Sequence, residues 1–207
     1  MEHQPEGAGP EPTGNQEHEE QQEAHEAFHE EGPRIYVASL GDYNAGVLHG
    51  IWIDAGQEPA LLQEQVDAML ARSPTADAEE FAVHDYEGFG QYAVDEYDSL
   101  GWLSRVACGI HEHGLAFGAW AARIEHDESA LDEFEDAYLG EWDSVEAYAE
   151  DLMDSFDWQD ALYNQLPGAL HPYVKIDIEG FARDLELSGD ITVAHHANGV
   201  WIFDGRT

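Results

Sequence analysis

In the first ordered part of this chain, apolar and polar residues alternate with a period of two residues. Three segments alternate in this way, which predicts β-strands: RIYVASL (34–40), VLHGIWIDA (47–55) and EFAVHDYE (80–87). Between the second and third of them, residues 59–73 place their apolar side chains on one helical face, and Pro59 suits a helix start. A small unit of three strands and one helix is therefore predicted over residues 34–88.

The period then changes to that of helices, and no strand signal occurs between Gly88 and Leu166. Five helices are predicted in this central part: 95–112, 115–125, 129–139, 144–157 and 158–165. Ser129 with Asp132 fits a helix start and Gly140 a helix end, while Asp143 or Ser144 suits the cap of the next helix. We expect a helical bundle over 89–166.

A third pattern follows Pro167 and Gly168. The segment PYVKIDI (172–178) predicts the end of a strand that leads into a helix, IEGFARDLEL (178–187). The final segment, 190–205, predicts a hairpin with its turn at 196–199. The predicted fold is thus an α+β chain of three small domains, 34–88, 89–166 and 167–207.

Residues 1–33 have a different composition from the rest. They hold ten Glu, no Lys or Arg and many Gln, Gly and Pro residues, which is typical of a disordered acidic tail. His25 and His29 would share a face if this part were helical, but a solvated tail explains the composition better than a metal site does.

Charge narrows the possible partners. The chain carries 45 acidic and seven basic residues, a formal net charge of −38. Direct binding to nucleic acid is not expected, because so few basic residues are available to hold phosphate groups. Basic proteins or cations are the expected partners. The single cysteine, Cys108, allows no internal disulfide, which fits the cytoplasm. No stretch predicts a secretory signal or a membrane span.

The charge concentrates in residues 125–160, which contain no Lys or Arg. Fully helical at about 1.5 Å per residue, this run would carry one charge about every 3.6 Å, close to the roughly 3.4 Å between phosphates along one strand of B-DNA. We therefore expect its carboxylates to form a partner-binding surface: Glu125, Asp127, Glu128, Asp132, Glu133, Glu135, Asp136, Glu141, Asp143, Glu146, Glu150, Asp151, Asp154, Asp157 and Asp160.

The same residues also have to be compared with the patterns of metal sites and enzymes. The segments 111–113 (His-Glu-His) and 195–196 (His-His) lack a third metal ligand at a recognisable spacing, and no EF-hand loop is present. Cys108 reads as a buried, inert thiol. No catalytic motif occurs, so no enzymatic activity, metal or cofactor is predicted. Adaptation to high salt and binding of histone-like proteins remain alternatives for the acidic surface.

Several stretches resemble the ArdA antirestriction proteins of conjugative elements: IYVASLGDYNAGVLHGIWIDA (35–55), EEFAVHDYEGFG (79–90), EYDSL (96–100), FEDAYLGEWDSVEAYAEDL (134–152), KIDIEGFARDLEL (175–187) and GVWIFDG (199–205). The resemblance implies an elongated dimer that mimics double-stranded DNA and occupies the DNA-binding groove of type I restriction-modification enzymes, thereby protecting incoming mobile DNA. The first stretch looks architectural, with its glycines in turns and Trp52 in the core.

Overall fold

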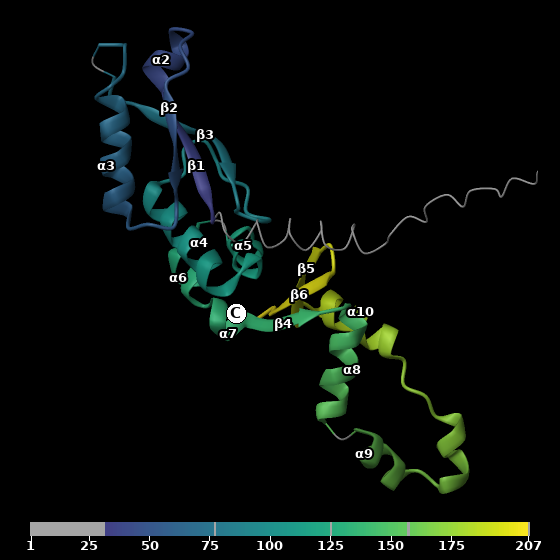
Figure 1. The fold of residues 1–207 in the computed structure, drawn as a ribbon. Helices are drawn as coiled ribbons and strands as arrows, with labels where there is room; N and C mark the ends of the chain where they lie inside the picture. The colour runs from purple at the N-terminus through teal and green to yellow at the C-terminus, as the bar shows by residue number, and fades with distance from the viewer. Residues whose placement is uncertain (1–31, 77, 125, 157, 207) are drawn as a thin grey trace, which may run out of the picture. The chain divides into compact units, whose positions relative to one another are not determined.

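The chain forms two compact units, one ending at Glu112 and the other beginning at His113. The computed structural model describes residues 32–76, 78–124, 126–156 and 158–206 (Figure 1). Both units combine helices with a three-stranded antiparallel sheet, which confirms the predicted α+β class. The predicted acidic tail lies outside the described residues, apart from Gly32 and Pro33. The domain boundaries at residues 88 and 166 stay predictions.

The first unit is built on a sheet with the strand order β2-β1-β3. Its elements are β1 (Arg34–Ser39), α2 (Leu40–Asn44), β2 (Gly50–Asp54), α3 (Pro59–Leu70), β3 (Phe81–Glu87) and α4 (Leu100–His113), the last residue of which belongs to the second unit. The strand alternation predicted from the sequence buries Ile35, Val37 and Ile53 against Leu62 and Val66 of α3. All three predicted strands and the helix between them are confirmed.

Two expectations for the first unit are wrong. Trp52 is 40% exposed instead of buried, because it lies on the other side of β2 from Ile53 and packs on Tyr36, with ring centroids 5.6 Å apart. Gly50 lies within β2 and not in a turn; a Cβ there would sit 2.4 Å from the carbonyl oxygen of Val37. Gly46, with φ of 78°, does occupy a turn.

A buried carboxylate, Asp42, ties α2 to the segment that follows α3. Its side chain has no exposed surface and accepts hydrogen bonds from Ser73 Oγ (2.6 Å) and the backbone N–H of Thr75 (3.1 Å). Burial by itself would raise the pKa of Asp42, but the hydrogen bonds from Ser73, Thr75 and Ser39 outweigh it and lower the pKa to about 2.

We expect this group to make the first unit sensitive to acid. An unfolded Asp has a pKa of about 3.9, so the stabilisation from Asp42 is complete above that pH and is lost as the pH falls towards 2. In thermal unfolding followed by circular dichroism, Asp42→Asn should lower the Tm at pH 7 and reduce its dependence on pH between 4 and 2. Glu64→Gln, an exposed change on α3, is the control. Equal pH profiles for both variants would contradict the assignment.

The second unit is built on a sheet with the strand order β4-β6-β5. Its elements are α5 (Leu115–Ala121), α6 (Glu128–Asp132), α7 (Phe134–Ala137), β4 (Tyr138–Trp142), α8 (Val145–Ser155), α9 (Trp158–Gln165), the 3-10 helix η1 (Gly168–Tyr173), α10 (Ile178–Ser188), β5 (Ile191–His196) and β6 (Gly199–Asp204). β5 and β6 form the predicted hairpin, in which His196 pairs with Gly199.

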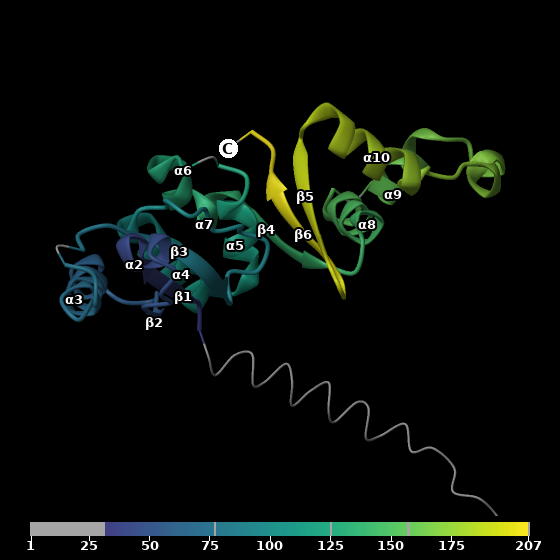
Figure 2. The same ribbon diagram turned by 90° about the horizontal axis from the view of Figure 1, so that it is seen from above.

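Side chains from β6 contribute to two apolar groups. Val200 and Ile202 belong to a core cluster with residues of α8 and α10, which lie side by side (Figure 2). Phe203, fully buried, packs between the rings of Trp120 and Phe134, with centroids 5.4 and 6.3 Å away. The acidic segments before and after β4 are therefore both anchored to one hydrophobic strand.

The strand β4 corrects the prediction that only helices occur between Gly88 and Leu166. The predicted helix 129–139 is instead two short helices followed by this strand, and Gly140 lies inside the strand with φ of 113°. In the third part, PYVKIDI contains the end of η1 and an irregular segment, and no strand. None of the helices in the described part of the chain has the length and apolarity required to cross a bilayer.

Candidate partner-binding surface

Helix α8 displays its carboxylates because its other face is buried. Ser144 caps the helix, as one of the two predicted caps, by accepting a hydrogen bond from the N–H of Ala147 (3.1 Å). Val145 and Ala149 are buried in a core cluster with residues of the sheet and of α10. The opposite side exposes these carboxylates: Glu146, Glu150, Asp151 and Asp154.

The short helices α6 and α7 repeat this arrangement with different details. Leu131, Phe134 and Ala137 are buried, so the charged residues between them face solvent. The predicted start at Ser129 is wrong, because Asp127 is the N-cap and accepts from the N–H groups of Ser129 and Ala130. Hydrogen bonds from the Ser129 hydroxyl and from these N–H groups lower the pKa of Asp127, which keeps it ionised.

Glu141 on β4 has two close neighbours. The indole N–H of Trp201 donates to Glu141 Oε2 (3.4 Å), and His196 Nε2 lies 3.5 Å from Glu141 Oε1. The His196 ring stacks on Trp201 at 4.3 Å between centroids. The Glu141 side chain is 58% exposed and is therefore accessible to a partner.

Every described member of the predicted set is exposed. Glu125 and Asp157 lie outside the described residues, and the other thirteen are these: Asp127, Glu128, Asp132, Glu133, Glu135, Asp136, Glu141, Asp143, Glu146, Glu150, Asp151, Asp154 and Asp160. All lie in the second unit, on or beside α6, α7, β4, α8 and α9. The assignment of partner binding to these individual carboxylates stays a prediction.

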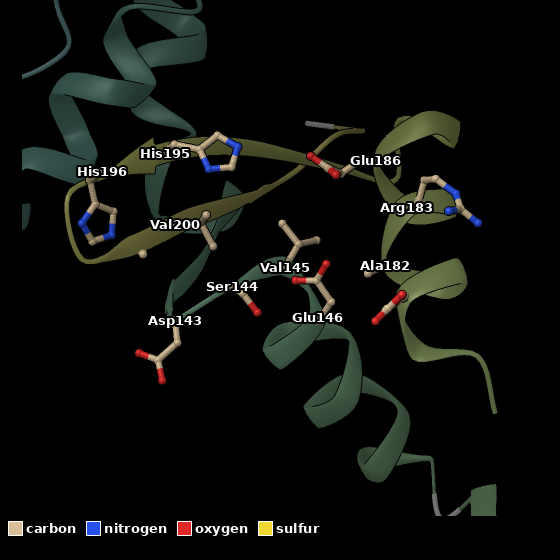
Figure 3. A pocket seen from close by; sticks show the side chains of 12 residues that line it. Asp143, Ser144, Val145, Glu146, Ala182, Arg183, Glu186, His195, His196 and Val200 are labelled. Atoms are coloured by element: carbon tan, nitrogen blue, oxygen red, sulfur yellow. The ribbon is translucent and has the colours of Figure 1, made fainter. Parts of the chain in front are cut away.

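A pocket of about 340 Å³ opens beside the start of α8 (Figure 3). Its lining joins the α8 segment, which provides Asp143 and Glu146, with α10 and the β5–β6 hairpin. Helix α10 adds Glu179 and Glu186, two carboxylates that lie outside the predicted run. Sequence reasoning missed them because only the packing of α10 against α8 brings them to this surface.

The histidine and cysteine candidates have different outcomes in the structure. No group of three or more His, Cys, Asp or Glu side chains is placed to hold a metal ion within the ranges that the structure describes. Cys108 is exposed, which corrects the expectation of a buried thiol. The stripe of α4 that is buried runs through Leu103, Val106, Ala107 and Ile110, and Cys108 lies beside this stripe.

Comparison with known proteins identifies one family. A family model described as "Antirestriction protein (ArdA)" matches residues 35–199, which is most of the chain and includes parts of both units. A search of curated proteins gave no match.

Proposed function

This chain belongs to the ArdA antirestriction protein family, and we propose that it inhibits type I restriction-modification enzymes as a mimic of double-stranded DNA. Family membership implies an antirestriction function carried out by a non-catalytic inhibitor. The mode of inhibition, the partner surface and the dimer are our proposal. In this proposal the protein acts in the cytoplasm, where its basic partner would otherwise bind DNA.

The observation that carries the proposal is the exposure of all thirteen described carboxylates of the acidic run. On α8, Glu146, Glu150, Asp151 and Asp154 fall within eight residue steps, or about 12 Å along the axis. Four charges over that length correspond to one about every 4 Å, near the roughly 3.4 Å between phosphates of one DNA strand. Lys and Arg side chains arranged to hold a duplex could therefore pair with such a row.

The carboxylates of the run repel one another, so their density favours a role in binding over a role in solubility alone. Carboxylates four residues apart, such as Glu146 with Glu150 and Glu150 with Asp154, destabilise a helix by about 0.2–0.5 kcal/mol per pair. Burial of Val145 and Ala149 offsets this cost and keeps the charges on a structured scaffold. A flexible polyacid would lose conformational entropy on adopting the same spacing, so the folded surface should bind more tightly.

A displacement assay tests this function. The methyltransferase core of a type I enzyme is bound to a labelled duplex, and the protein is titrated in at two salt concentrations, with polyglutamate of matched charge as the control. We expect release of the duplex at near-stoichiometric protein, with an apparent affinity that falls steeply at the higher salt, because both partners release counterions. Polyglutamate should need a far higher concentration.

Displacement no better than that by polyglutamate would contradict duplex mimicry. An acidic protein that binds histone-like or other basic proteins without duplex geometry is the alternative, and it requires only the net charge of −38. The same titration against a histone-like protein on DNA separates the two functions. A mimic of shape prefers the methyltransferase core, whereas a general acidic binder removes both proteins alike.

We further propose that the protein acts as a homodimer, with contacts from exposed apolar side chains of the second unit. Leu170 and Tyr173 of η1 are 47% and 82% exposed, and Leu187 of α10 is 79% exposed. These three side chains leave apolar area of the second unit open to solvent. Association of two chains would remove this apolar area from water, which favours a dimer.

Sedimentation velocity checks the dimer. The chain has a mass of 23.0 kDa, so a dimer should sediment as a species of about 46 kDa. Tyr173→Ser combined with Leu187→Ser should shift the dissociation constant upwards by at least about tenfold, through loss of buried apolar area. Leu48→Ser, a change of a 76% exposed leucine in the first unit, serves as the matched control. A monomeric wild-type chain, or equal effects of both variants, would contradict this interface.

A further inference from the structure

The first unit contains a hollow whose chemistry differs from that of the carboxylate surface. It has a volume of about 420 Å³ and is lined by Tyr43 of α2, by Val83, His84 and Tyr86 of β3, and by Val94 and Glu96 before α4. Three separate parts of the sequence, 43, 83–86 and 94–96, thus meet at one place. None of these residues belongs to the carboxylate surface that is proposed to bind the partner.

The walls of the hollow are held by identified contacts. The Tyr43 ring meets His84 edge to face, with centroids 4.7 Å apart. The N–H of Val83 donates to the carbonyl oxygen of Glu96 (3.0 Å), which joins the third wall to β3. These bonds place aromatic rings, apolar groups and one carboxylate around a space that exists before any ligand binds.

A buried network fixes the segment that carries Val94 and Glu96. Asp98 Oδ2 accepts hydrogen bonds from the Tyr92 hydroxyl (2.7 Å) and from the N–H of Asp95 (2.9 Å). The Tyr92 hydroxyl in turn accepts from the indole N–H of Trp102 of α4 (2.7 Å). The segment is therefore anchored to the buried face of α4, and the hollow does not depend on a loose loop.

The residues that line the hollow favour a ligand with a flat, weakly hydrated cationic group. Tyr43 and Tyr86 are 58% and 37% exposed, so their ring surfaces are accessible to a ligand. Aromatic faces attract cations, and Glu96 adds a full negative charge, while no Lys or Arg lines the hollow. An anion would be repelled by Glu96 and by the net charge of −38. Guanidinium stacks on aromatic rings better than ammonium does and is easier to desolvate.

We propose that this hollow receives an arginine side chain of the protein that the chain inhibits. The inference rests on the proposed function for the identity of the partner, and the contact itself is defined by chemistry alone. An arginine seated between Tyr43, Tyr86 and Glu96 provides an anchor that combines ring stacking with one ion pair. Ring stacking acts at contact distance and depends less on long-range charge than a row of exposed ion pairs does, so we expect this anchor to weaken less with salt than the exposed carboxylates do.

A peptide titration tests the hollow without the restriction enzyme. The full chain, labelled on valine methyl groups, is titrated by NMR with acetyl-Gly-Arg-Gly-amide and with the same peptide carrying citrulline, a neutral isostere of arginine. We expect saturable shifts of the Val83 and Val94 methyl signals with the arginine peptide only. Tyr43→Ala and Glu96→Gln should each weaken that binding about fivefold to tenfold, whereas Tyr43→Phe, which keeps the ring, should preserve it.

Matched controls distinguish the site from general electrostatics. Tyr97→Ala removes a 72% exposed tyrosine next to Glu96 that does not line the hollow, and Glu64→Gln removes one exposed charge from α3. Both variants should bind the arginine peptide as the wild type does. Equal shifts with citrulline, a lysine peptide that binds more tightly than the arginine peptide, or equal losses in Tyr97→Ala and Tyr43→Ala would each overturn the proposal.

The displacement assay then links the hollow to inhibition. Tyr43→Ala should reduce displacement of the duplex about fivefold to tenfold at both salt concentrations, whereas loss of carboxylates should act mainly at low salt. A wild-type chain that binds the arginine peptide but displaces no duplex refutes the proposed function and leaves the arginine site standing. A chain that displaces the duplex but shows no specific peptide binding refutes the arginine site alone.

Discussion

Replacing Glu146, Glu150, Asp151 and Asp154 together by their amides is expected to weaken inhibition about 100-fold, although each single replacement should change it by less than about threefold. Exposed ion pairs contribute about 0–1 kcal/mol each, so one lost carboxylate has little effect. Four losses on one helix add to a few kcal/mol, which corresponds to two orders of magnitude in affinity. All four residues are exposed in the structure.

The stability of α8 provides an internal check on this result. Removing the like-charge pairs Glu146 with Glu150 and Glu150 with Asp154 should leave the helix as stable as before or slightly more stable. Unfolding of the variant would thus be an unexpected cause of lost inhibition, and circular dichroism detects it directly. The inhibition constant is measured by duplex displacement at two salt concentrations, where the variant should also show a shallower dependence on salt.

A second set of four substitutions separates a local surface from diffuse charge. Glu58, Glu64, Asp67 and Glu79 of the first unit are exposed, and their amides change the net charge by the same amount. Inhibition should weaken much less in this control. Equal losses in both variants would show that only total charge matters, which would favour the acidic-binder and salt-adaptation readings. A single substitution that abolished inhibition would contradict a distributed surface.

The sequence predicted those features that depend on local periodicity. The helix that contains α8 follows from residue spacing, since a helix is set by neighbours three and four positions away. The spacing left Asp143 and Ser144 open as its cap, and the structure selects Ser144. The three strands of the first unit follow from alternation in the same way. The exposure of the acidic residues on α8 could also be predicted, because a run without Lys or Arg offers no cationic side chain to pair with a buried carboxylate.

Features that depend on distant pairing were missed. The strand β4 forms because Glu141 and Trp142 pair with Trp201 and Val200, some 60 residues away, while its five residues alone fit a helix end. The exposure of Trp52 was missed because alternation shows that a strand has two faces and does not show which face is covered. The hollow between Tyr43 and Glu96 likewise exists only through packing of α2, β3 and the segment before α4.

Phe203→Ala is expected to reduce inhibition at elevated temperature to the level of polyglutamate, although it removes no charge. Phe203 is fully buried and packs on Trp120, Phe134 and Tyr138, with ring centroids between 5.4 and 6.3 Å away. Truncating a phenylalanine in such a site costs about 3–5 kcal/mol through lost burial and the cavity left behind. The midpoint of thermal unfolding of the second unit should fall accordingly, whereas the exposed change Phe156→Ala should shift stability by less than about 0.5 kcal/mol.

This variant decides whether the carboxylates act through a scaffold, because it separates charge from structure. Phe134 is the first residue of α7, and Tyr138 is the first residue of β4. Their contacts with Phe203 therefore fix both α7 and the strand that leads to α8 to the hydrophobic core. Inhibition and circular dichroism are measured on the same samples across the unfolding range. Inhibition should fall together with the folded fraction, down to the level of polyglutamate. Full inhibition by a chain that has lost its structure would mean that an unfolded polyacid suffices, and duplex mimicry by a rigid surface would be refuted.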